Sequence, residues 1–309
     1  MTSLAVVIVN YRSWEPLAAC LASLADLDAE IVVVDNASGD GRLGDFASDH
    51  PDVRFIQAEH NFGFAYGCNL GAALTRAPLL LFLNPDTRDP GGQLASLAEL
   101  AESHPEAGIF SVRQVDERGR PQRVHDRFPG LLTLFGPVRS LLRRVAPRVD
   151  WVSGSVLLIR RALFERLGGW DPGYWMYSED VDLCWRAHAI GHRCHYFERA
   201  TVIHQHGGSS RRDPETTALT KAETTISRHY FAARHFGRIH AACYHAALFL
   251  VRFLPVVLAA GVRPLLPLRP IRVRARVAAH LLAYYRRVLE VRTWRSPRAA
   301  PGESQGDNS

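Results

Sequence analysis

Residues 31–41 read Ile31-Val32-Val33-Val34-Asp35-Asn36-Ala37-Ser38-Gly39-Asp40-Gly41, an apolar run that passes at once into a polar turn with two glycines. A short, continuous apolar run is typical of a parallel strand that is covered on both faces. Similar runs occur at Val6–Val9, Val53–Ile56 and Leu79–Leu83. The first half of the chain is therefore predicted to form a parallel β-sheet.

Helical patterns separate these strands, at about residues 16–25, 41–48, 65–74 and 92–103. Alternating strands and helices predict an α/β fold, a doubly wound and mostly parallel sheet that binds its ligand at the carboxyl ends of the strands. Polar motifs follow three of the strands at that edge: Asn10-Tyr11-Arg12, Asp35–Gly41 and Asn84-Pro85-Asp86-Thr87.

The second half begins with an irregular connection over residues 113–150, which is expected to form surface loops and a mobile lid. A buried strand is predicted at 151–159. After it, we expect helices at about 161–167, 179–190 and 216–236, with a strand at 194–197.

The C-terminal part differs from the rest of the chain in charge. The net charge is +6, but residues 234–298 hold thirteen arginines and a single acid, Glu290, a balance of +12. The remaining 24 basic and 30 acidic residues balance at −6. Because apolar runs separate the arginines, this basic extension indicates an anionic membrane surface as partner. Nucleic acid is the alternative partner of the tail alone.

Residues 240–261 are almost wholly apolar and near the length of a membrane-spanning helix. Arg252 and Pro255 interrupt them, so an interfacial helix or hairpin is predicted. Residues 272–291 repeat the basic and apolar pattern, and the Pro-, Gly- and Ser-rich end, 296–309, is expected to be disordered.

The cysteines and the N-terminus indicate the compartment. Five cysteines include no C-x-x-C pair, which argues against a disulfide framework or a structural zinc and favours a reducing compartment. No basic stretch precedes the apolar run at Val6–Val9, so this run is predicted to be a strand and not a signal peptide. The expected location is cytoplasmic, at the inner face of the cell membrane.

Ionisable residues are densest between Trp170 and His206. This stretch contains Glu179, Asp180 and Asp182, and later the pair His204-Gln205-His206. Three carboxylates and an imidazole are costly to bury unless they bind a cation or move a proton. The cluster therefore predicts a catalytic site.

Motifs along residues 3–236 resemble glycosyltransferase family 2, the inverting nucleotide-sugar enzymes with the GT-A fold. Those similar to its nucleotide-binding half are Val7-Ile8-Val9-Asn10-Tyr11, Val34–Asp40, Asn61-Phe62-Gly63-Phe64-Ala65 and Asn84-Pro85-Asp86. Those similar to its acceptor half are Trp151-Val152-Ser153-Gly154-Ser155 and Ser178–Leu183. The Ser-Gly-Ser stretch, residues 176–182 and the His-x-His pair look most like the rhamnosyltransferase branch. Some members of that branch act on polyprenyl-diphosphate-linked sugars, and they carry membrane-associating extensions similar to this tail.

The resemblance implies that Asp35 accepts the N3–H of uracil or thymine. On the residues alone, a turn aspartate that caps the next helix is the alternative. Tyr11 could stack on the base or pack on the sheet. The other expected nucleotide-binding residues are Asn10, Asn61, Gly63, Asn84 and Asp86.

The resemblance also implies a divalent cation, Mg²⁺ or Mn²⁺, that bridges the two phosphates. The family's Asp-x-Asp is Asn84-Pro85-Asp86 here, so Asp86 is the one carboxylate left. Asp86, the phosphates and a histidine can complete the shell, and His204 is preferred to His206. Asn84 is then expected to contact the ribose or a bound water.

Asp180 is the predicted general base, the carboxylate that deprotonates the acceptor hydroxyl. Adjacent helical residues point about 100° apart, so Glu179 and Asp180 cannot share one task, and the resemblance places the base at the second acid. Asp182 is expected to stabilise the helix N-terminus. The alternative is that three acids only decorate the start of a helix.

The expected acceptor and sugar pocket consists of Trp151, Ser153, Gly154, Trp175, Tyr177 and Glu179. Aromatic rings suit the apolar faces of sugars, and glycine permits close approach, although such residues could equally be ordinary core. Phe62, Gly63, Phe64 and Asn69 are expected to shape the floor near the diphosphate.

Other enzyme classes fit less well. A nucleotidyltransferase would need a Gly- and Lys-rich first loop, and a dinucleotide-binding dehydrogenase would need G-x-G-x-x-G after the first strand. The first loop, Asn10-Tyr11-Arg12-Ser13-Trp14, offers neither. A non-catalytic, membrane-associated nucleotide-sugar-binding protein remains an alternative, as does a family member that uses a UDP-sugar.

The prediction is a metal-dependent, inverting glycosyltransferase that moves L-rhamnose from a thymidine diphosphate donor to a lipid-linked or cell-envelope saccharide. Residues 1–112 are expected to bind the nucleotide sugar and 113–236 the acceptor. Residues 237–295 are expected to form Arg-rich amphipathic or apolar helices, followed by the disordered tail.

Overall fold

The computed structural model describes residues 3–104, 106–205, 213–261 and 269–301. The chain divides into two compact units. The first comprises Met1–Phe128, Ala146–Asp171 and Glu179–Ser209, and the second comprises Pro129–Val145, Pro172–Ser178 and Ser210–Ser309. The predicted boundaries at residues 112, 236 and 295 separate segments by the substrate that each binds. A division into compact units does not test them, so they stay a prediction.

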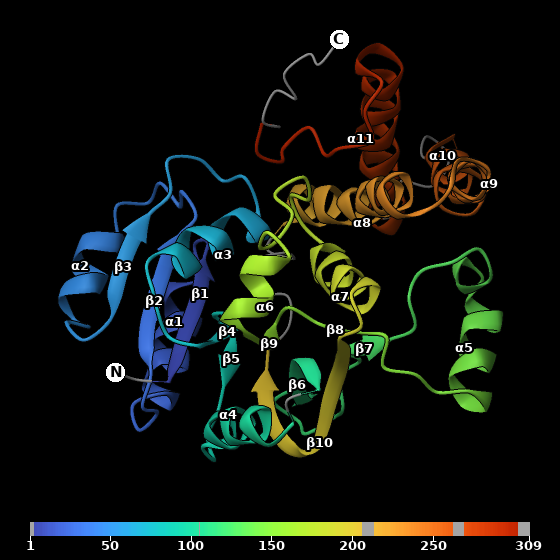
Figure 1. Ribbon diagram of the computed structural model, residues 1–309. Helices are drawn as coiled ribbons and strands as arrows, with labels where there is room; N and C mark the ends of the chain where they lie inside the picture. Colours follow the sequence, from blue (N-terminus) through green and yellow to red (C-terminus); the bar gives the residue numbers. More distant parts are fainter. Residues whose placement is uncertain (1–2, 105, 206–212, 262–268, 302–309) are drawn as a thin grey trace, which may run out of the picture. The chain divides into compact units, whose positions relative to one another are not determined.

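An eight-stranded sheet runs through the described part of the first unit, in the order β3-β2-β1-β4-β9-β6-β10-β5 (Figure 1). The strands are β1 (Leu4–Asn10), β2 (Glu30–Asp35), β3 (Arg54–Gln57), β4 (Leu79–Leu83), β5 (Thr87–Arg88), β6 (Ala107–Val115), β9 (Val156–Arg160) and β10 (Arg193–His204). The first four pair in parallel, as do β6 and β10. Strand β9 is antiparallel to both of its neighbours. The predicted α/β fold with a mostly parallel sheet is confirmed.

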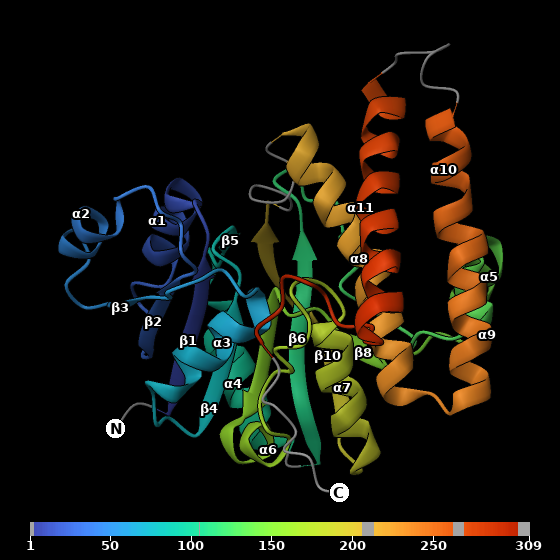
Figure 2. The ribbon, with the colours of Figure 1, turned by 90° about the horizontal axis from the view of Figure 1, so that it is seen from above.

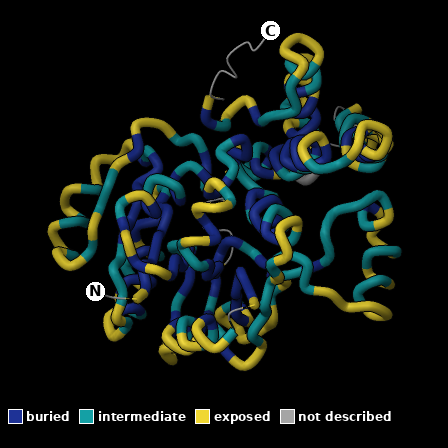
Figure 3. Tube along the Cα trace, in the orientation of Figure 1, coloured by how far each residue is buried: buried dark blue, intermediate teal, exposed yellow. Residues whose placement is uncertain are grey.

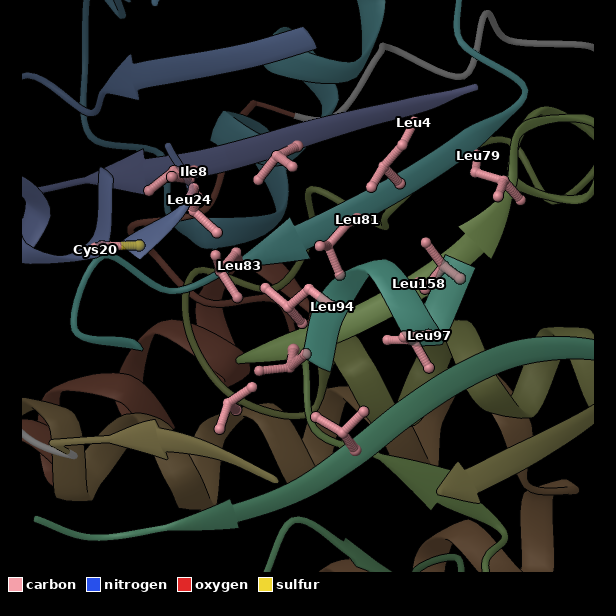
Figure 4. Close-up of a cluster of buried hydrophobic side chains, with 14 of the residues drawn as sticks. Leu4, Ile8, Cys20, Leu24, Leu79, Leu81, Leu83, Leu94, Leu97 and Leu158 are labelled. Carbon is pink, nitrogen blue, oxygen red and sulfur yellow. The ribbon is translucent and has the colours of Figure 1, made fainter. Parts of the chain in front are cut away.

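Side chains alternate along the strands and build two cores, one on each face of the sheet. On one face, Leu4, Val6 and Ile8 of β1 pack with α1 (Trp14–Ser23) and α4 (Gln93–Ser103), and Figure 4 shows part of this cluster. On the other face, Ala5, Val7 and Val9 pack with α3 (Phe64–Ala73), α6 (Arg161–Arg166) and α7 (Glu179–Ala189). A short helix, α2 (Leu43–Ser48), follows β2. Burial on both faces explains why the strands are continuously apolar.

The strand predicted at 151–159 is in fact two strands that belong to different sheets. β8 (Trp151–Val152) pairs with β7 (His125–Asp126), whereas β9 begins at Val156 and joins the main sheet. The chain passes from one sheet to the other between them, and a hydrogen bond at each end continues the ladder on that side. The Ser153 N–H donates to the carbonyl of Val124, and the carbonyl of Ser155 accepts from Asn84. An apolar run alone does not reveal such a change of partner.

Two other predicted segments also differ. The strand expected at 194–197 extends over twelve residues as β10, with register shifts against β6. The connection predicted as loops over 113–150 contains β7, the 3₁₀ turn η1 (Leu132–Leu134) and helix α5 (Gly136–Val145). The full length of β10 and the whole of α5 were not predicted, because β10 is largely half-exposed and α5 has no buried residue, and neither has a continuous apolar run in its sequence.

Helices dominate the second unit (Figure 2). Helix α8 (Pro214–His235) begins where Asp213 accepts hydrogen bonds from the N–H groups of Glu215 and Thr216. It packs against α11 (Arg269–Val291) through a core that contains Ala218, Ala222, Ile226, Phe253, Val277, Leu281 and Tyr284. The helices predicted for this part of the chain are therefore present.

Residues 238–261 form one continuous helical stretch, so of the two predicted alternatives the helix is present and the hairpin is not. It consists of α9 (Arg238–Leu248), a π-helical turn η2 (Phe249–Phe253) and α10 (Leu254–Gly261). The π turn lies just before Pro255, whose ring would clash with an ordinary helical carbonyl, and it absorbs the mismatch. The stretch is long and apolar enough to cross a membrane, and only 22% of its most apolar window is buried (Figure 3).

The chain after α11 is partly ordered, contrary to the prediction for 296–309. Ser296 is buried, and its hydroxyl donates to Oε1 of Glu223 on α8 at 3.1 Å. The rest of the predicted tail, residues 302–309, lies outside the described residues, as does His206.

Candidate active site

The first cluster of site residues forms where β1 and β2 end side by side. The parallel register pairs Asn10 with Asp35, and Nδ2 of Asn10 donates to Oδ1 of Asp35 at 3.2 Å. Asp35 is 1% exposed, and it also accepts hydrogen bonds from the backbone N–H (3.1 Å) and the hydroxyl of Ser38. Asp35 therefore holds the turn in shape, but it does not cap the next helix, because α2 begins after Arg42 and has no side-chain cap hydrogen bond.

The same turn is braced by Arg12, which has a left-handed backbone with φ 52°. The Arg12 N–H donates to the Ser38 hydroxyl at 2.8 Å, and its Nε donates to the Ser38 carbonyl at 2.7 Å. A left-handed backbone is unfavourable for a residue with a side chain, so these bonds fix the loop at a cost. The guanidinium of Arg12 lies 5.5 Å from the ring of Tyr11.

A cavity of about 450 Å³ opens beside Asp35. It is lined by Asp35, Gly39, Asp40, Gly41, Leu43, Gly44, Ala47, Phe55 and Gln57. The volume lies in the range of small-molecule sites, and the lining combines apolar side chains with one buried carboxylate. These properties suit a nucleobase, and the contact of Asp35 with a base stays a prediction.

Asn61 and Gly63 are connected to the turn after β2 by hydrogen bonds from Asn36. Nδ2 of Asn36 donates to Oδ1 of Asn61 at 3.0 Å and to the Gly63 carbonyl at 3.1 Å. Gly63 has φ 100°, which side-chain-bearing residues rarely adopt, and it immediately precedes helix α3. These two predicted residues are thus tied to the turn after β2.

The second cluster brings together Asn84, Asp86 and His204. Strand β5 pairs with the end of β10, with Thr87 opposite His204, so that Asp86 and His204 become neighbours. Oδ1 of Asp86 lies 3.2 Å from Nε2 of His204, and Nδ2 of Asn84 lies 3.4 Å from the same nitrogen. His204 is 3% exposed and is the last residue of β10.

This donor set fits a divalent cation that also binds phosphate. Two ligands in adjacent positions of an octahedral ion lie about 3 Å apart, close to the Asp86–His204 separation. The described residues include no group of three or more His, Cys, Asp or Glu side chains that could hold a metal. A cation here would therefore need ligands from the substrate, as a diphosphate provides.

The third cluster is built around Asp180 at the start of α7. Its Oδ2 accepts a hydrogen bond from the N–H of Gly154 at 3.2 Å. A Cβ added at Gly154 would lie 3.2 Å from Phe64, 3.3 Å from Trp170 and 3.6 Å from Asp180, so only glycine fits without displacement. Gly154 thus allows Phe64 and Trp170 to pack closely beside Asp180, and its contact with a sugar stays a prediction.

One short loop connects the second and third clusters. Gly154 donates to Asp180, and the next residue, Ser155, accepts the N–H of Asn84 at 2.9 Å through its carbonyl. The Ser155 hydroxyl donates to Oε1 of the buried Gln114 at 2.9 Å. The acid on α7 and the Asp86–His204 pair thus share one edge of the sheet.

The adjacent acids Glu179 and Asp180 lie in different environments. Glu179 is buried, with 7% of its surface exposed. Burial, and then the charge of Asp180, raise the pKa of Glu179 well above its usual value. Burial also raises the pKa of Asp180, but hydrogen bonds from the N–H groups of Gly154 and Val181 oppose the shift. Backbone hydrogen bonds thus favour the charged form of Asp180, whereas the neighbouring charge disfavours the charged form of Glu179.

The other predicted acceptor residues are placed as follows. Nε1 of Trp151 donates to the Arg127 carbonyl at 2.9 Å, and the Ser153 and Ser155 hydroxyls lie 3.0 Å apart. Trp175 and Tyr177 belong to the second unit, where the Arg298 guanidinium lies 5.8 Å from the Trp175 ring. Contact of these residues with an acceptor stays a prediction.

Asp182 serves a structural role. It lies in the first turn of α7, as predicted, and its Oδ2 also binds Arg186 at 2.6 Å. Arg186 donates further to the carbonyls of Leu167 and Gly169. The pair therefore fixes α7 against the turn that precedes Trp170.

Sequence reasoning missed three polar residues that support the site. They are Ser38, which orients Asp35, Gln114, which holds Ser155, and Gln122, whose Nε2 donates to the His204 carbonyl at 2.5 Å. Ser38 lies in a motif that was singled out, so its role could have been foreseen. The two glutamines carry no signal in the sequence, because their partners are distant along the chain.

Comparisons with known proteins agree with this geometry. The sequence model of a family described as glycosyl transferase family 2 matches residues 5–168. An N-acetylglucosaminyl-diphospho-decaprenol L-rhamnosyltransferase from Mycobacterium tuberculosis is 29% identical over 266 residues, which cover 76% of this chain and 85% of the relative. The rhamnosyltransferase WbbL of Escherichia coli is 31% identical over 163 residues, covering 46% of this chain and 61% of the relative.

Solved structures share the fold at low sequence identity. A mannosyltransferase from Pyrobaculum calidifontis, in complex with GDP-Man and Mn²⁺, superposes with a TM-score of 0.57 at 18% identity, over 94% of this chain and 88% of that one. Residues 1–349 of TarS from S. aureus, in complex with UDP, give 0.52 at 16% identity, over 92% and 91%. At these identities the likeness shows the fold alone.

Proposed function

The chain belongs to glycosyl transferase family 2, and we propose that it transfers L-rhamnose, with inversion, from a thymidine diphosphate donor to a polyprenyl-diphosphate-linked saccharide. Glycosyl transfer as such follows from the family and from the related rhamnosyltransferases. The donor sugar, the acceptor and the roles of individual residues are the proposed part.

One observation carries the proposal. In the loop Ser153-Gly154-Ser155, the N–H of Gly154 donates to Asp180 at the start of α7. The carbonyl of Ser155 accepts the N–H of Asn84, which lies beside the Asp86–His204 pair. Inverting transfer needs a carboxylate on one side of the anomeric carbon and charge stabilisation at the leaving diphosphate on the other. The loop therefore connects Asp180, a carboxylate suited to the first task, with the Asp86–His204 pair, which is suited to the second.

The choice of sugar and acceptor rests on the relatives. The relative from Mycobacterium tuberculosis is named for transfer of L-rhamnose to a decaprenol-linked N-acetylglucosaminyl diphosphate, and its alignment covers most of both chains. A second rhamnosyltransferase, WbbL, aligns over a shorter region. A lipid-linked acceptor also suits the apolar, basic helices after residue 237.

The residues divide the reaction into three tasks. Asp35 orients the pyrimidine base in the cavity beside β2. Hydrogen bonds from Asn10 and Ser38 already hold its carboxylate in place. Asp86 and His204 hold a divalent cation, which when bound stabilises the charge on the departing nucleoside diphosphate. Asp180 takes the proton of the acceptor hydroxyl as the oxygen attacks the anomeric carbon.

Membrane association is part of the same proposal. The stretch Arg238–Gly261 is long and apolar enough to enter a bilayer, and it is mostly unburied. The arginines of residues 234–298 would meet the anionic inner leaflet, where a polyprenyl-linked acceptor is available to a cytoplasmic enzyme.

A donor panel tests the proposal. The purified chain is incubated with Mg²⁺ or Mn²⁺, a short polyprenyl-diphosphate N-acetylglucosamine, and in turn dTDP-rhamnose, UDP-glucose, UDP-galactose and GDP-mannose. We expect release of dTDP and an acceptor product heavier by one deoxyhexose, in the dTDP-rhamnose reaction only. Efficient use of a UDP-sugar with no use of dTDP-rhamnose would overturn the donor assignment. Turnover by Asp180→Asn at the normal rate would overturn the site assignment.

A further inference from the structure

Helix α5 presents an apolar face to the outside of the second unit. All ten of its residues are described and none of them is buried, as Figure 3 shows along this helix. Leu141 and Val145 are 59% and 67% exposed, and before the helix Leu132 and Phe135 are 64% and 47% exposed. At 100° per residue, Val138, Leu141, Leu142 and Val145 fall on one side of the helix. Side chains of this size are rarely left together in water.

Basic residues occupy the opposite side of the same helix. Arg139, Arg143 and Arg144 lie away from the apolar stripe. The sequence between Asp126 and Asp150 contains five arginines and no acid. A short helix with leucine and valine on one side and arginine on the other is typical of an element that lies in the headgroup region of an anionic bilayer.

The surroundings of α5 within its unit have the same character. Leu134, just before α5, is buried against Tyr244 and Leu248 of α9, so α5 is tied to the apolar stretch Arg238–Gly261. Burial, together with the charges of Arg252 and Arg139, lowers the pKa of Arg228 on α8 to about 10. Neither Arg228 nor Arg252 forms an ion pair with a described acid. These cations raise the positive potential where α5 begins.

We propose that α5 is a membrane-contact element, with Leu141 and Val145 inserted among lipid acyl chains and its arginines at the level of anionic headgroups. The inference deepens the membrane association proposed above, but α5 lies outside residues 237–295, on which that association rests. A bilayer is favoured over a second copy of the chain as the partner. Four apolar residues on a ten-residue helix offer far less than the roughly 1,000 Å² that a stable protein interface buries.

A depth-sensitive label tests the contact directly in the full chain. Cys243 is exposed, so Cys243→Ser provides the background, and an environment-sensitive NBD group is attached at Leu141→Cys. The matched control carries the label at Ser140→Cys, the neighbouring exposed residue on the polar side. With phosphatidylglycerol-containing vesicles, the label at 141 is expected to rise in fluorescence at least twofold and to be quenched by lipid-borne quenchers. The label at 140 is expected to change little.

A partition measurement gives the second readout. Leu141→Gln/Val145→Gln should weaken binding to phosphatidylglycerol-containing vesicles at least tenfold, whereas Ser140→Gln should leave it unchanged. Arg144→Gln should weaken binding to these vesicles and have no effect with phosphatidylcholine alone, since its contribution is electrostatic. Thermal unfolding and turnover of a water-soluble acceptor analogue should be the same for all three variants, because the substituted side chains are exposed.

The outcomes separate the proposals. Equal fluorescence and quenching at positions 140 and 141, or unchanged vesicle binding by Leu141→Gln/Val145→Gln, would overturn the inference. So would a wild-type dimer that these two substitutions convert to a monomer, which would make the face an interface between copies. If no nucleotide sugar is turned over while the label at 141 still enters the bilayer, the proposed function fails and the membrane contact stands.

Discussion

At the scale of single residues, two adjacent acids have been given different properties by their surroundings. Burial raises the pKa of both acids; the charge of Asp180 adds to the shift of Glu179, whereas hydrogen bonds from the N–H groups of Gly154 and Val181 oppose the shift of Asp180. A general base must be ionised before it can accept a proton. These surroundings support Asp180 as the proposed base, the acid at which the family resemblance places it.

Asp180→Asn is expected to lower kcat at least about 1,000-fold, because an amide cannot accept the proton of the acceptor hydroxyl. Donor binding should stay within about twofold, since Asp180 is not assigned to the nucleotide. Transfer rates and calorimetric titration with dTDP check both statements. Glu179→Gln provides the comparison, and it should lower kcat by much less.

His204→Ala is expected to reduce transfer at 1 mM Mn²⁺ by about 10- to 100-fold, and excess Mn²⁺ should restore part of it, because a ligand is lost while Asp86 remains. The measurement is initial rate against metal concentration. His206→Ala, two residues away, is the matched control and should leave the metal dependence unchanged. Equal effects of the two substitutions would refute the preference for His204.

At the scale of elements, the loop between β8 and β9 connects Asp180, the proposed base, with Asn84 beside the proposed cation ligands Asp86 and His204. Gly154→Ala should displace Asp180, because the added methyl group would press on Phe64 and Trp170. We expect transfer to fall about 10- to 100-fold, with a loss of stability of about 1–2 kcal/mol. Gly130→Ala, where a Cβ meets nothing within 4 Å, is the control for the substitution itself. Unchanged transfer by Gly154→Ala would show that the loop does not position Asp180.

Helix α8 contains a buried acid that makes stability depend on pH. Burial raises the pKa of Glu223 from 4.5 to about 7, with partial compensation from the Ser296 hydroxyl and the charge of Arg298. When folding raises the pKa of a carboxyl, the free energy of unfolding falls as the pH rises from the pKa of the unfolded state to the pKa of the folded state. Stability should therefore fall between pH 4.5 and 7, by up to about 3 kcal/mol from this group.

Glu223→Gln should flatten the dependence of Tm on pH in that window and raise Tm at pH 8 by several degrees, because the neutral amide can still accept from Ser296. The groups that act on this position are the Arg298 guanidinium, the Ser296 hydroxyl and the neutral Tyr284 hydroxyl. Differential scanning calorimetry from pH 4.5 to 8 measures the effect. The exposed Glu290→Gln should keep the original profile, and an identical profile for Glu223→Gln would contradict the assignment.

At the scale of the whole molecule, the proposed membrane association of the helical unit is better tested with point substitutions than with a deletion. Ala218, Ala222 and Ile226 of α8 share a core with Val277, Leu281 and Tyr284 of α11. Removing residues 238–309 would expose this core, and loss of membrane binding could then reflect unfolding.

Leu250→Asn/Leu258→Asn is the sharper change, because these side chains are 59% and 64% exposed. We expect the protein to shift from the membrane fraction to the supernatant, since two large apolar groups no longer enter the lipid, while Tm changes by less than about 2 °C. Flotation with vesicles and thermal unfolding are the two measurements. Unaltered flotation would refute a role for this helix in binding membranes.

The sequence by itself determined the parallel half of the sheet, its two layers of helices and the edge that carries the polar motifs. Continuous apolar runs such as Val6–Val9 can be buried only when both faces of the strand are covered, so the local pattern already contains the architecture. The resemblance to glycosyltransferase family 2 added the expected roles of Asp35, Asp86 and Asp180, and the family itself is confirmed.

Only the tertiary structure decided which residues meet across the sheet. Asp86 and His204 are brought to 3.2 Å by the pairing of β5 with β10, and Gln114 and Gln122 reach their partners through strands that are distant in sequence. The break at 153–155 is of the same kind, since its polar groups bind Val124 and Asn84. Hydrogen-bond partners far apart along the chain leave no local pattern, because the free energy that selects them comes from the assembled fold.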